Sequence, residues 1–531
     1  MSLLAASMPI IERLSYLKPE MALGAGACVV MMLGLSPKRS VRLGCEMFSI
    51  FALLAAFALA LFATPAHATS ALPNLMPFAK AMIAAVGVVL VMALSGTVDR
   101  DVEARAERTG KFDKARSTRG EFYSFFLFSL MGLMLCASAD DLIWLFLALE
   151  LTSLPTYVMV SISTARRESQ EAGVKYFFLG AFGAATFLFG FAMLFGSAGT
   201  TQLFGAGSIA EHLLLHGIGP IAMLGVVMSI IGVSFKIAAV PMHFYTPDVY
   251  QGAATPVSAM LAFVPKAAGF ITLMLLLSAV GWRYGAHGDA LPEAIRVLLW
   301  VMAALTMTVG NVLAWLQTSV KRMLAYSSVA HSGYMIVGLI AGPGDGSLAS
   351  NGLAAVLFYL MAYGFTNVGA FAVLSALEHR SGREADSIDD IRGLWKTQPM
   401  LAVVMAVCVA SLLGLPPLLG FFGKLFLFTS AIGAGEIALV VVLGLNSAVA
   451  AYYYLRIIGL PMLKDPDAVS QDMRLSPFPA RTLVGVVSAA SAVLLVAVAS
   501  QLMHASNNAT AYSAVVASGG DVEATPVSSV E

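Results

Sequence analysis

Long apolar segments recur along nearly the whole chain, and they constrain its fold more than any other feature. Of the 531 residues, 59% are hydrophobic and 12% are charged, whereas a soluble domain has about 25% charged residues. Windows of about 19 residues predict about fourteen membrane spans. They lie near 19–35, 43–63, 78–96, 120–138, 140–160, 173–197, 218–243, 256–280, 294–315, 320–341, 353–379, 398–431, 435–463 and 481–503. The sequence therefore predicts an all-α polytopic membrane protein.

Basic residues gather in alternate loops between these spans. They cluster at 38–42, 100–119, 166–167, 321–322, 380–396 and 464–474, while the intervening loops hold little besides Arg283. Short loops rich in Lys and Arg stay in the cytoplasm, so we expect both termini on the non-cytoplasmic side. Acidic and basic residues balance at 31 each, so the net charge gives no indication of a nucleic-acid partner.

Two of the expected spans are interrupted beside a lysine. Span seven contains Lys236 and Pro241, and span twelve contains Pro416, Pro417 and Lys424. Proline removes a backbone donor and clashes with the preceding turn, so the first helix is predicted to break just past Lys236. The two spans are five apart, an odd number, so equivalent segments would cross the membrane in opposite directions. This pattern predicts two inverted five-helix repeats, spans 4–8 and 9–13, with discontinuous helices 7 and 12.

The expected organisation follows from these repeats. The segments are a three-helix region with a charged cytoplasmic loop at 1–119, a first repeat at 120–280, a second inverted repeat at 294–463, a C-terminal helix at 464–503 and a disordered tail at 504–531.

Four ionisable residues lie too deep in their spans to reach water easily: Glu150, Lys236, Lys266 and Lys424. Glu150 and Lys266 are about ten residues from a span end, roughly 15 Å at 1.5 Å per residue. A charge at a helix centre costs about 2.5–3.5 kcal/mol on insertion, so such groups are expected to be paired or functional. We predict that Glu150 pairs with a lysine.

Other charges have a simpler explanation. Glu46, Lys80, Arg296, Arg456 and Arg481 lie within a turn or two of a predicted helix end. We expect these side chains to reach the membrane interface by snorkelling.

A histidine also falls near the middle of a span. His331 lies about ten residues beyond Lys321, where it could relay protons near neutral pH. It could equally be a neutral histidine that hydrogen-bonds serine, tyrosine or backbone, and the sequence leaves both roles open.

Several stretches resemble the antiporter-like membrane subunits of respiratory complex I, most closely the N branch. They are LALELTSLPTYVMV, EAGVKYFFLGAF, FKIAAVPMHFYTPDVYQGAATPVSAMLAFVPKAAGF, KRMLAYSSVAHSGYM and GLPPLLGFFGKLFLF. The LELxSLPxY and TPDVYxGAxTP forms favour this branch over its L and M paralogues, as does Lys424 where M carries glutamate. The chain also ends after span fourteen, without the long lateral helix of L.

The resemblance implies a role for each deep residue in proton translocation. It implies that Glu150 is the carboxylate of span five, Lys236 the lysine of broken span seven and Lys266 a central relay. Lys424 would be the lysine on the exit half.

Two further residues complete the implied set. Lys175 matches an additional lysine on span six, and His331 falls where the central polar axis of the family passes.

The resemblance also implies a setting for the chain. It would be a subunit of NADH:quinone oxidoreductase in a bacterial inner membrane, with both termini periplasmic, coupling quinone reduction elsewhere to proton transfer. NADH, FMN, Fe–S clusters and quinone would belong to other subunits, and this chain shows no glycine-rich phosphate loop or cysteine cluster. Expected partners are the paralogous M subunit, the small K and J subunits and the lipid bilayer.

Three alternatives were weighed against this interpretation. The nearest is a subunit of a related multi-subunit Na+/H+ antiporter, which shares the broken helices and lysines but not the TPDVYQG form. A solute transporter would need a cavity with substrate-specific polar groups, and a scaffold would gain nothing from four deep charges.

Overall fold

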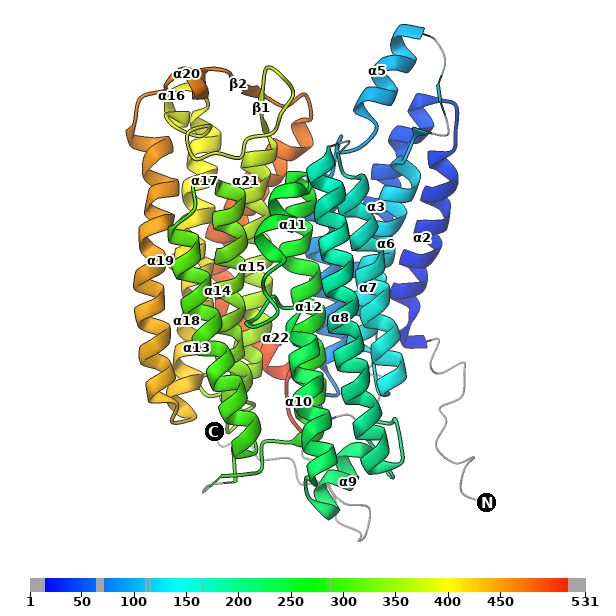
Figure 1. Ribbon diagram of the computed structural model, residues 1–531, viewed down its shortest axis with the longest axis vertical. Coiled ribbons are helices and arrows are strands. Elements are labelled where there is room, and N and C mark those ends of the chain that lie inside the picture. The colour runs from blue at the N-terminus through cyan, green and yellow to red at the C-terminus, as the bar shows by residue number, and fades with distance from the viewer. Residues whose placement is uncertain are drawn as a thin grey trace.

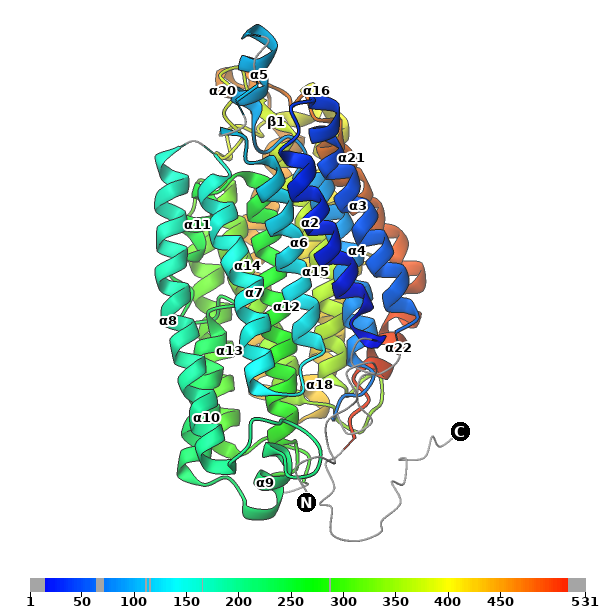
Figure 2. The same ribbon diagram turned by 90° about the vertical axis from the view of Figure 1, so that its right-hand side faces the viewer.

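The chain folds into a bundle of long helices that run between two ends (Figure 1). The computed structural model describes residues 15–63, 71–109, 112–113, 116–164, 166–285 and 288–513. The short α5 (Arg100–Thr109), α16 (Leu394–Thr397) and α20 (Ala468–Gln471) gather at one end, where the basic loops also lie. We call this the basic end. α2 starts and α22 finishes away from it (Figures 1 and 2).

The N-terminal region has three spans before α5. These are α2 (Lys18–Gly34), α3 (Arg39–Leu61) and α4 (Leu75–Ala93).

The first five-span unit follows. It consists of α6 (Arg119–Ala137), α7 (Leu142–Ile162), α8 (Arg167–Ala198), the divided pair α10 (Pro220–Ser234) and α11 (Thr246–Gly252), and α12 (Thr255–Val280), with the short α9 (Ile209–His216) before α10.

The second unit repeats this order. It consists of α13 (Glu293–Trp315), α14 (Val320–Ala341), α15 (Gly352–Ser375), the divided pair α17 (Pro399–Leu413) and α18 (Leu419–Gly433), and α19 (Ile437–Leu463).

The chain then returns through α21 (Pro479–Leu494), η2 (Leu495–Val498) and α22 (Ala499–Ala509). Helix α22 continues six residues beyond the expected end at 503, into the segment expected to be disordered. Its C-terminal end is held by hydrogen bonds from Asn351 to Asn507 and Thr510. Residues 514–531 of the expected tail lie outside the described residues.

The predicted polytopic all-α fold is confirmed. Eleven described helices are long and apolar enough to cross a membrane, the shorter α2 corresponds to the first expected span, and spans seven and twelve are each divided. The break falls in the fourth span of each unit, and α10 starts at the end opposite to the start of α17 (Figure 1). One small extramembrane sheet adds two antiparallel strands, β1 (Leu377–His379) and β2 (Met473–Leu475).

Three helices form the centre of the bundle. All 26 residues of α12 are buried, and α14 and α15 are almost completely buried as well. Helix α12 packs against both, and Pro265 inside it does not interrupt the helix. Polar side chains on these three helices are therefore enclosed by protein.

The first break starts earlier than the proline predicts. Helix α10 ends at Ser234, so Lys236 lies within the break and not on the helix before it. Ala238 has a φ of +54°, in the left-handed region that a helix cannot accommodate. The change of backbone direction is thus made at Ala238, three residues before Pro241.

Two charges expected to snorkel are instead fully buried. Lys80 has 0% exposure and pairs with Glu20, its Nζ lying 2.7 Å from the Oε1 atom. Arg481 also has 0% exposure. The snorkelling prediction is wrong for both because partners from distant parts of the sequence meet them inside the protein.

Arg481 joins the ends of several helices. Its Nε donates to the Ser95 carbonyl and its Nη1 to the Ser375 carbonyl, both at 2.9 Å. Nη1 also lies 3.8 Å from Glu378 Oε1 and 3.7 Å from Glu384 Oε1. The guanidinium therefore stabilises two carbonyls and two carboxylates at the basic end.

The pKa of the Glu384 carboxyl reflects the charges that surround it. Burial would raise its pKa, but the charges of Lys321 and Arg481 and hydrogen bonds from Thr255 hold the pKa below its usual value. Both cations therefore keep this partly buried carboxylate ionised.

Arg481→Met is expected to destabilise the protein by about 2 kcal/mol, because a buried donor to charged partners is lost. The thermal unfolding midpoint of the detergent-solubilised assembly measures this. Arg380→Met is the matched control, since the Arg380 side chain is 78% exposed at the same end. Equal midpoints for the two variants would show that the Arg481 contacts do not stabilise the fold.

Candidate functional site

Glu150 and Lys236 form an ion pair in the middle of the first unit. Asp141 caps α7 by accepting hydrogen bonds from the backbone of Ile143 and Trp144, and this fixed start places Glu150 about two and a half turns along the helix. Lys236 Nζ lies 3.3 Å from Glu150 Oε1 and also donates to Ser153 Oγ. The predicted pairing of the deep carboxylate with a lysine is thus present.

The two partners differ in exposure. The Lys236 side chain is 1% exposed and the Glu150 side chain 19%. The lysine is sealed inside the protein, while the carboxylate reaches the edge of the unit. Glu150 is therefore the more accessible partner of the pair.

Lys266 lies across the break from Lys236. Its Nζ lies 3.5 Å from the Ile237 carbonyl oxygen, which also accepts a hydrogen bond from Ser332. The turn at Ala238 leaves this carbonyl outside a helical ladder, so it is free to accept from side chains. The break thus supplies an acceptor between Lys236 and Lys266.

His331 lies between two tyrosine hydroxyls. Its Nδ1 is 2.6 Å from Tyr359 Oη and its Nε2 is 2.8 Å from Tyr454 Oη. Because a neutral imidazole has one donor and one acceptor nitrogen, one tyrosine donates to it and the other accepts. Ser327 extends the chain by a hydrogen bond with Tyr454.

Lys424 lies in the second turn of α18, and its side chain reaches back to the break in the second unit. Its Nζ donates to the Leu413 carbonyl at 2.8 Å and lies 5.0 Å from the centre of the Tyr334 ring. Gly414 has a φ of +88° and leaves no room for a Cβ beside the Lys424 stem. A glycine is therefore required where α17 ends.

These ionisable residues follow one another through the bundle core. Lys236, Lys266, His331 and Lys424 are each at most 5% exposed, and Tyr334 links the last two by contacting both His331 and Lys424. Ionisable groups at this depth are costly, so the arrangement is typical of an ion pathway.

Lys175 is placed apart from this row. Its side chain is 42% exposed and forms ion pairs with Glu171 at 2.7 Å and Asp248 at 2.9 Å. Arg322 bonds the same aspartate. The structure therefore places Lys175 in a charged surface cluster at the basic end, and a role in proton transfer stays a prediction.

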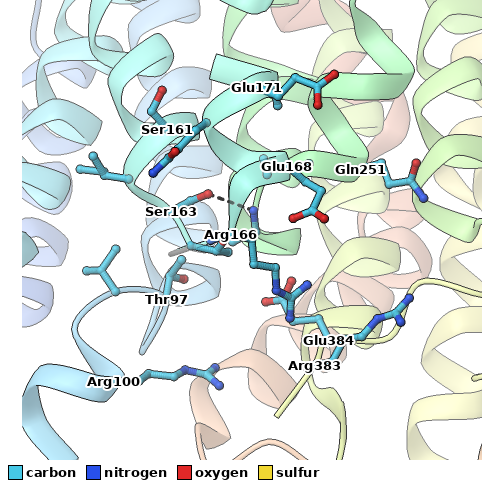
Figure 3. A pocket seen from close by; sticks show the side chains of 18 of the residues that line it. Thr97, Arg100, Ser161, Ser163, Arg166, Glu168, Glu171, Gln251, Arg383 and Glu384 are labelled. Atoms are coloured by element: carbon cyan, nitrogen blue, oxygen red, sulfur yellow. Dashed lines mark hydrogen bonds between the residues drawn. The ribbon is translucent and has the colours of Figure 1, made fainter. Parts of the chain in front are cut away.

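A cavity of about 1220 Å³ opens at the basic end. The side chains that Figure 3 shows around it include Thr97 and Arg100 near the start of α5, Ser161 and Ser163 at the end of α7, Glu168 and Glu171 on α8, Gln251 on α11, and Arg383 and Glu384 after β1. Acidic and basic groups are mixed in its lining, so it suits water and small ions more than a ligand of one charge.

The sequence analysis missed the hydroxyl groups that form hydrogen bonds with these ionisable residues. Ser153 follows Glu150 by three residues and so shares its helix face, a signal available from spacing alone. Tyr359 and Tyr454 are 28 and 123 residues from His331, and no local pattern links them. Within the described residues, no group of three or more His, Cys, Asp or Glu could hold a metal ion.

The middle of the chain matches a known family model. Residues 139–450 match the membrane domain described as NADH:quinone oxidoreductase/Mrp antiporter. This region contains all six predicted site residues.

That description names two kinds of protein, and the curated relatives show which of the two this chain resembles. A protein named NADH-quinone oxidoreductase subunit N from Rhodospirillum rubrum is 38% identical over 83% of this chain and 86% of its own length. A protein of the same name from Trichlorobacter lovleyi is 43% identical over 64% of this chain and 66% of its own length.

Solved structures agree with these matches. A chain of respiratory complex I from Thermus thermophilus, solved with bound aureothin, has a TM-score of 0.69 and 30% identity, covering 90% of this chain and 98% of that one. A chain of the Mrp complex from Dietzia has a TM-score of 0.72 at 18% identity, covering 95% and 97%, and this likeness shows the fold alone. By its family model and its relatives, the chain belongs to the NADH-quinone oxidoreductase subunit N family.

Proposed function

We propose that this chain moves protons across a bacterial inner membrane as the N-type membrane subunit of NADH-quinone oxidoreductase. The observation that carries the proposal is the row of buried ionisable residues from Lys236 to Lys424, which starts in the break of the first unit and ends beside the break of the second. Electron transfer to quinone, with its NADH, FMN and Fe–S groups, belongs to other subunits, and this chain supplies the proton path.

The route starts at the basic end. Loops rich in Lys and Arg stay in the cytoplasm, so the cavity is the cytoplasmic entrance and both termini are periplasmic. Protons pass from the Glu150–Lys236 pair to Lys266, then to His331, and leave past Lys424. Lys175, beside the entrance, modulates uptake through its carboxylate partners.

Glu150 controls the first transfer. When its carboxylate is close to Lys236, the charged form of the lysine is stabilised, and when it withdraws, burial favours release of the proton toward Lys266. Moving one charge against 100 mV takes about 2.3 kcal/mol, which a change in one close charge pair inside a protein can supply. Redox chemistry elsewhere in the complex drives the withdrawal.

The partners follow from this assignment. Other membrane-arm subunits flank the chain within the bilayer, and we propose that they include the paralogous M subunit and the small K and J subunits. The partly exposed Glu150 is then able to sense a neighbouring subunit.

A deletion strain tests the function. Inverted membrane vesicles from cells lacking this chain are expected to lose NADH-driven acidification of the lumen, and a plasmid copy is expected to restore it. The control is acidification driven by ATP hydrolysis, which should not change. A chain that works as an antiporter subunit would leave NADH-driven pumping intact and abolish Na+-dependent dissipation of a pH gradient, and that result would contradict the proposal.

A further inference from the structure

The hydroxyl groups of α7 form a line from the cavity to the ion pair. Glu150, Ser153, Tyr157 and Ser161 are spaced by three, four and four residues, so they share one face of the helix. Ser153 bonds Lys236, and Ser161 lines the cavity (Figure 3). Tyr157 is the group between them.

A cluster of aromatic rings blocks the path between the cavity and the Glu150–Lys236 ion pair. The Tyr157 ring lies 4.6 Å from that of Tyr176, Tyr176 stacks on Tyr245 at 5.1 Å, and Phe235 lies 4.4 Å from Tyr245. All four side chains are at most 5% exposed. Since Phe235 directly precedes Lys236, the cluster separates the cavity from the ion pair.

The Tyr157 hydroxyl has an unusual environment within this cluster. It is buried and forms no well-aligned hydrogen bond among the described residues, although the Ser153 hydroxyl lies close to it. A buried hydroxyl without a partner is costly and calls for an explanation. A phenol can donate one hydrogen bond and accept another, so this hydroxyl can exchange protons on both sides.

Helix α8 leaves room for these hydroxyls. A Cβ at Gly180 would overlap the Tyr157 hydroxyl, and a Cβ at Gly173 would overlap Ser161 Oγ. The two glycines are seven residues apart and so lie on one face of α8. The line of hydroxyls is thus enclosed by glycine backbone and would lose its space if either residue were larger.

We propose that the Tyr157 hydroxyl is the proton relay through the aromatic cluster, between the cavity and the Glu150–Lys236 pair. A proton arriving from water at Ser161 bonds to the phenol oxygen while the phenol's own proton leaves toward Glu150. One O–H bond forms and one breaks, so the tyrosine is unchanged and one proton has moved inward. The relay rests on the proposed function and adds a residue to its entrance.

Four variants test the relay, each assayed for NADH:quinone activity per assembled complex in H2O and D2O. Tyr157→Phe keeps the ring and is expected to lower the rate about tenfold and to enlarge the solvent isotope effect, because proton delivery becomes limiting. Tyr123→Phe is the matched control, a buried tyrosine in α6 whose hydroxyl bonds the Leu94 carbonyl, and it is expected to behave as wild type.

Tyr157→Ser distinguishes a relay from packing. A serine hydroxyl with space for water is expected to keep more activity than Tyr157→Phe, whereas a purely structural tyrosine predicts the reverse order. If Tyr157→Ser fails to assemble, the rate and isotope effect of Tyr157→Phe decide alone.

Lys236→Ala, assayed in parallel, separates the relay from the proposed function. Wild-type rate and isotope effect in Tyr157→Phe, with activity lost in Lys236→Ala, would overturn the relay and leave the proposed function standing. Full activity in Lys236→Ala would overturn the proposed function itself.

Discussion

Glu150→Ala is expected to lower NADH:quinone activity per assembled complex at least about a hundredfold, the range expected when a proton-transfer group is lost. Lys236 is 1% exposed and pairs with this carboxylate at 3.3 Å. Without the carboxylate, burial favours the neutral lysine in every state, so the site can no longer alternate between holding and releasing a proton. The measurement is quinone reduction in membranes, normalised to complex abundance by immunoblot.

Two further variants sharpen this expectation. Glu150→Gln keeps the size and hydrogen bonding of the side chain without its charge, and is expected to be as inactive as Glu150→Ala. Glu293→Ala removes a 73% exposed carboxylate that pairs with Arg296 one turn further along the same helix, α13, and is expected to retain full activity. Activity in Glu150→Gln close to wild type would show that the charge of Glu150 is dispensable.

Lys236→Ala is expected to cause a loss of similar size, because it removes the group that connects Glu150 to the second lysine. Lys266 lies across the break from Lys236 and bonds the Ile237 carbonyl, so a gap at Lys236 isolates the rest of the row from the entrance. The rate of NADH-driven quinone reduction in sealed membranes measures the effect.

Lys396→Ala is the matched control for this variant. Lys396 also pairs with a carboxylate, that of Asp465, but its side chain is 61% exposed, and exposed ion pairs contribute little. We expect the activity of Lys396→Ala to stay within about twofold of wild type. Equal losses in both lysine variants would mean that the buried position of Lys236 has no special role.

Much of the fold could be predicted because it depends on local sequence. Apolar runs long enough to cross a membrane mark each span, and Gly414, Pro416 and Pro417 mark the second break where the structure has it. The first break was predicted from Pro241, yet the backbone leaves the helix at Ser234. Tertiary hydrogen bonds flank the left-handed Ala238, from Ser332 to the Ile237 carbonyl and from the Val240 N–H to Thr306, and a local proline signal does not report them.

The candidate site was only partly accessible to sequence reasoning. The depth of Glu150 and Lys266 follows from counting residues into a span. The prediction that Glu150 pairs with a lysine was also correct. The partners of His331 were not predictable, because Tyr359 and Tyr454 lie on other helices. Tertiary contact, not spacing, brings these hydroxyls together.

Burial of charge near helix ends was the clearest failure. Lys80 and Glu20 are 60 residues apart in sequence and meet inside the N-terminal region, and Arg481 meets Glu378 and Glu384 over about a hundred residues. A helix-end position allows either snorkelling or pairing, and the choice depends on which neighbours pack there. Sequence position alone does not determine this.

Proton pumping by inverted vesicles from Lys236→Ala cells tests the central claim most directly, because it follows the transported proton itself. NADH is added to vesicles containing equal amounts of assembled complex, and lumen acidification is followed with a pH-sensitive dye. The buried row predicts that wild-type vesicles acidify and that Lys236→Ala vesicles neither acidify nor reduce quinone at an appreciable rate. Wild-type acidification per NADH oxidised in the Lys236→Ala vesicles would contradict a proton path through this lysine.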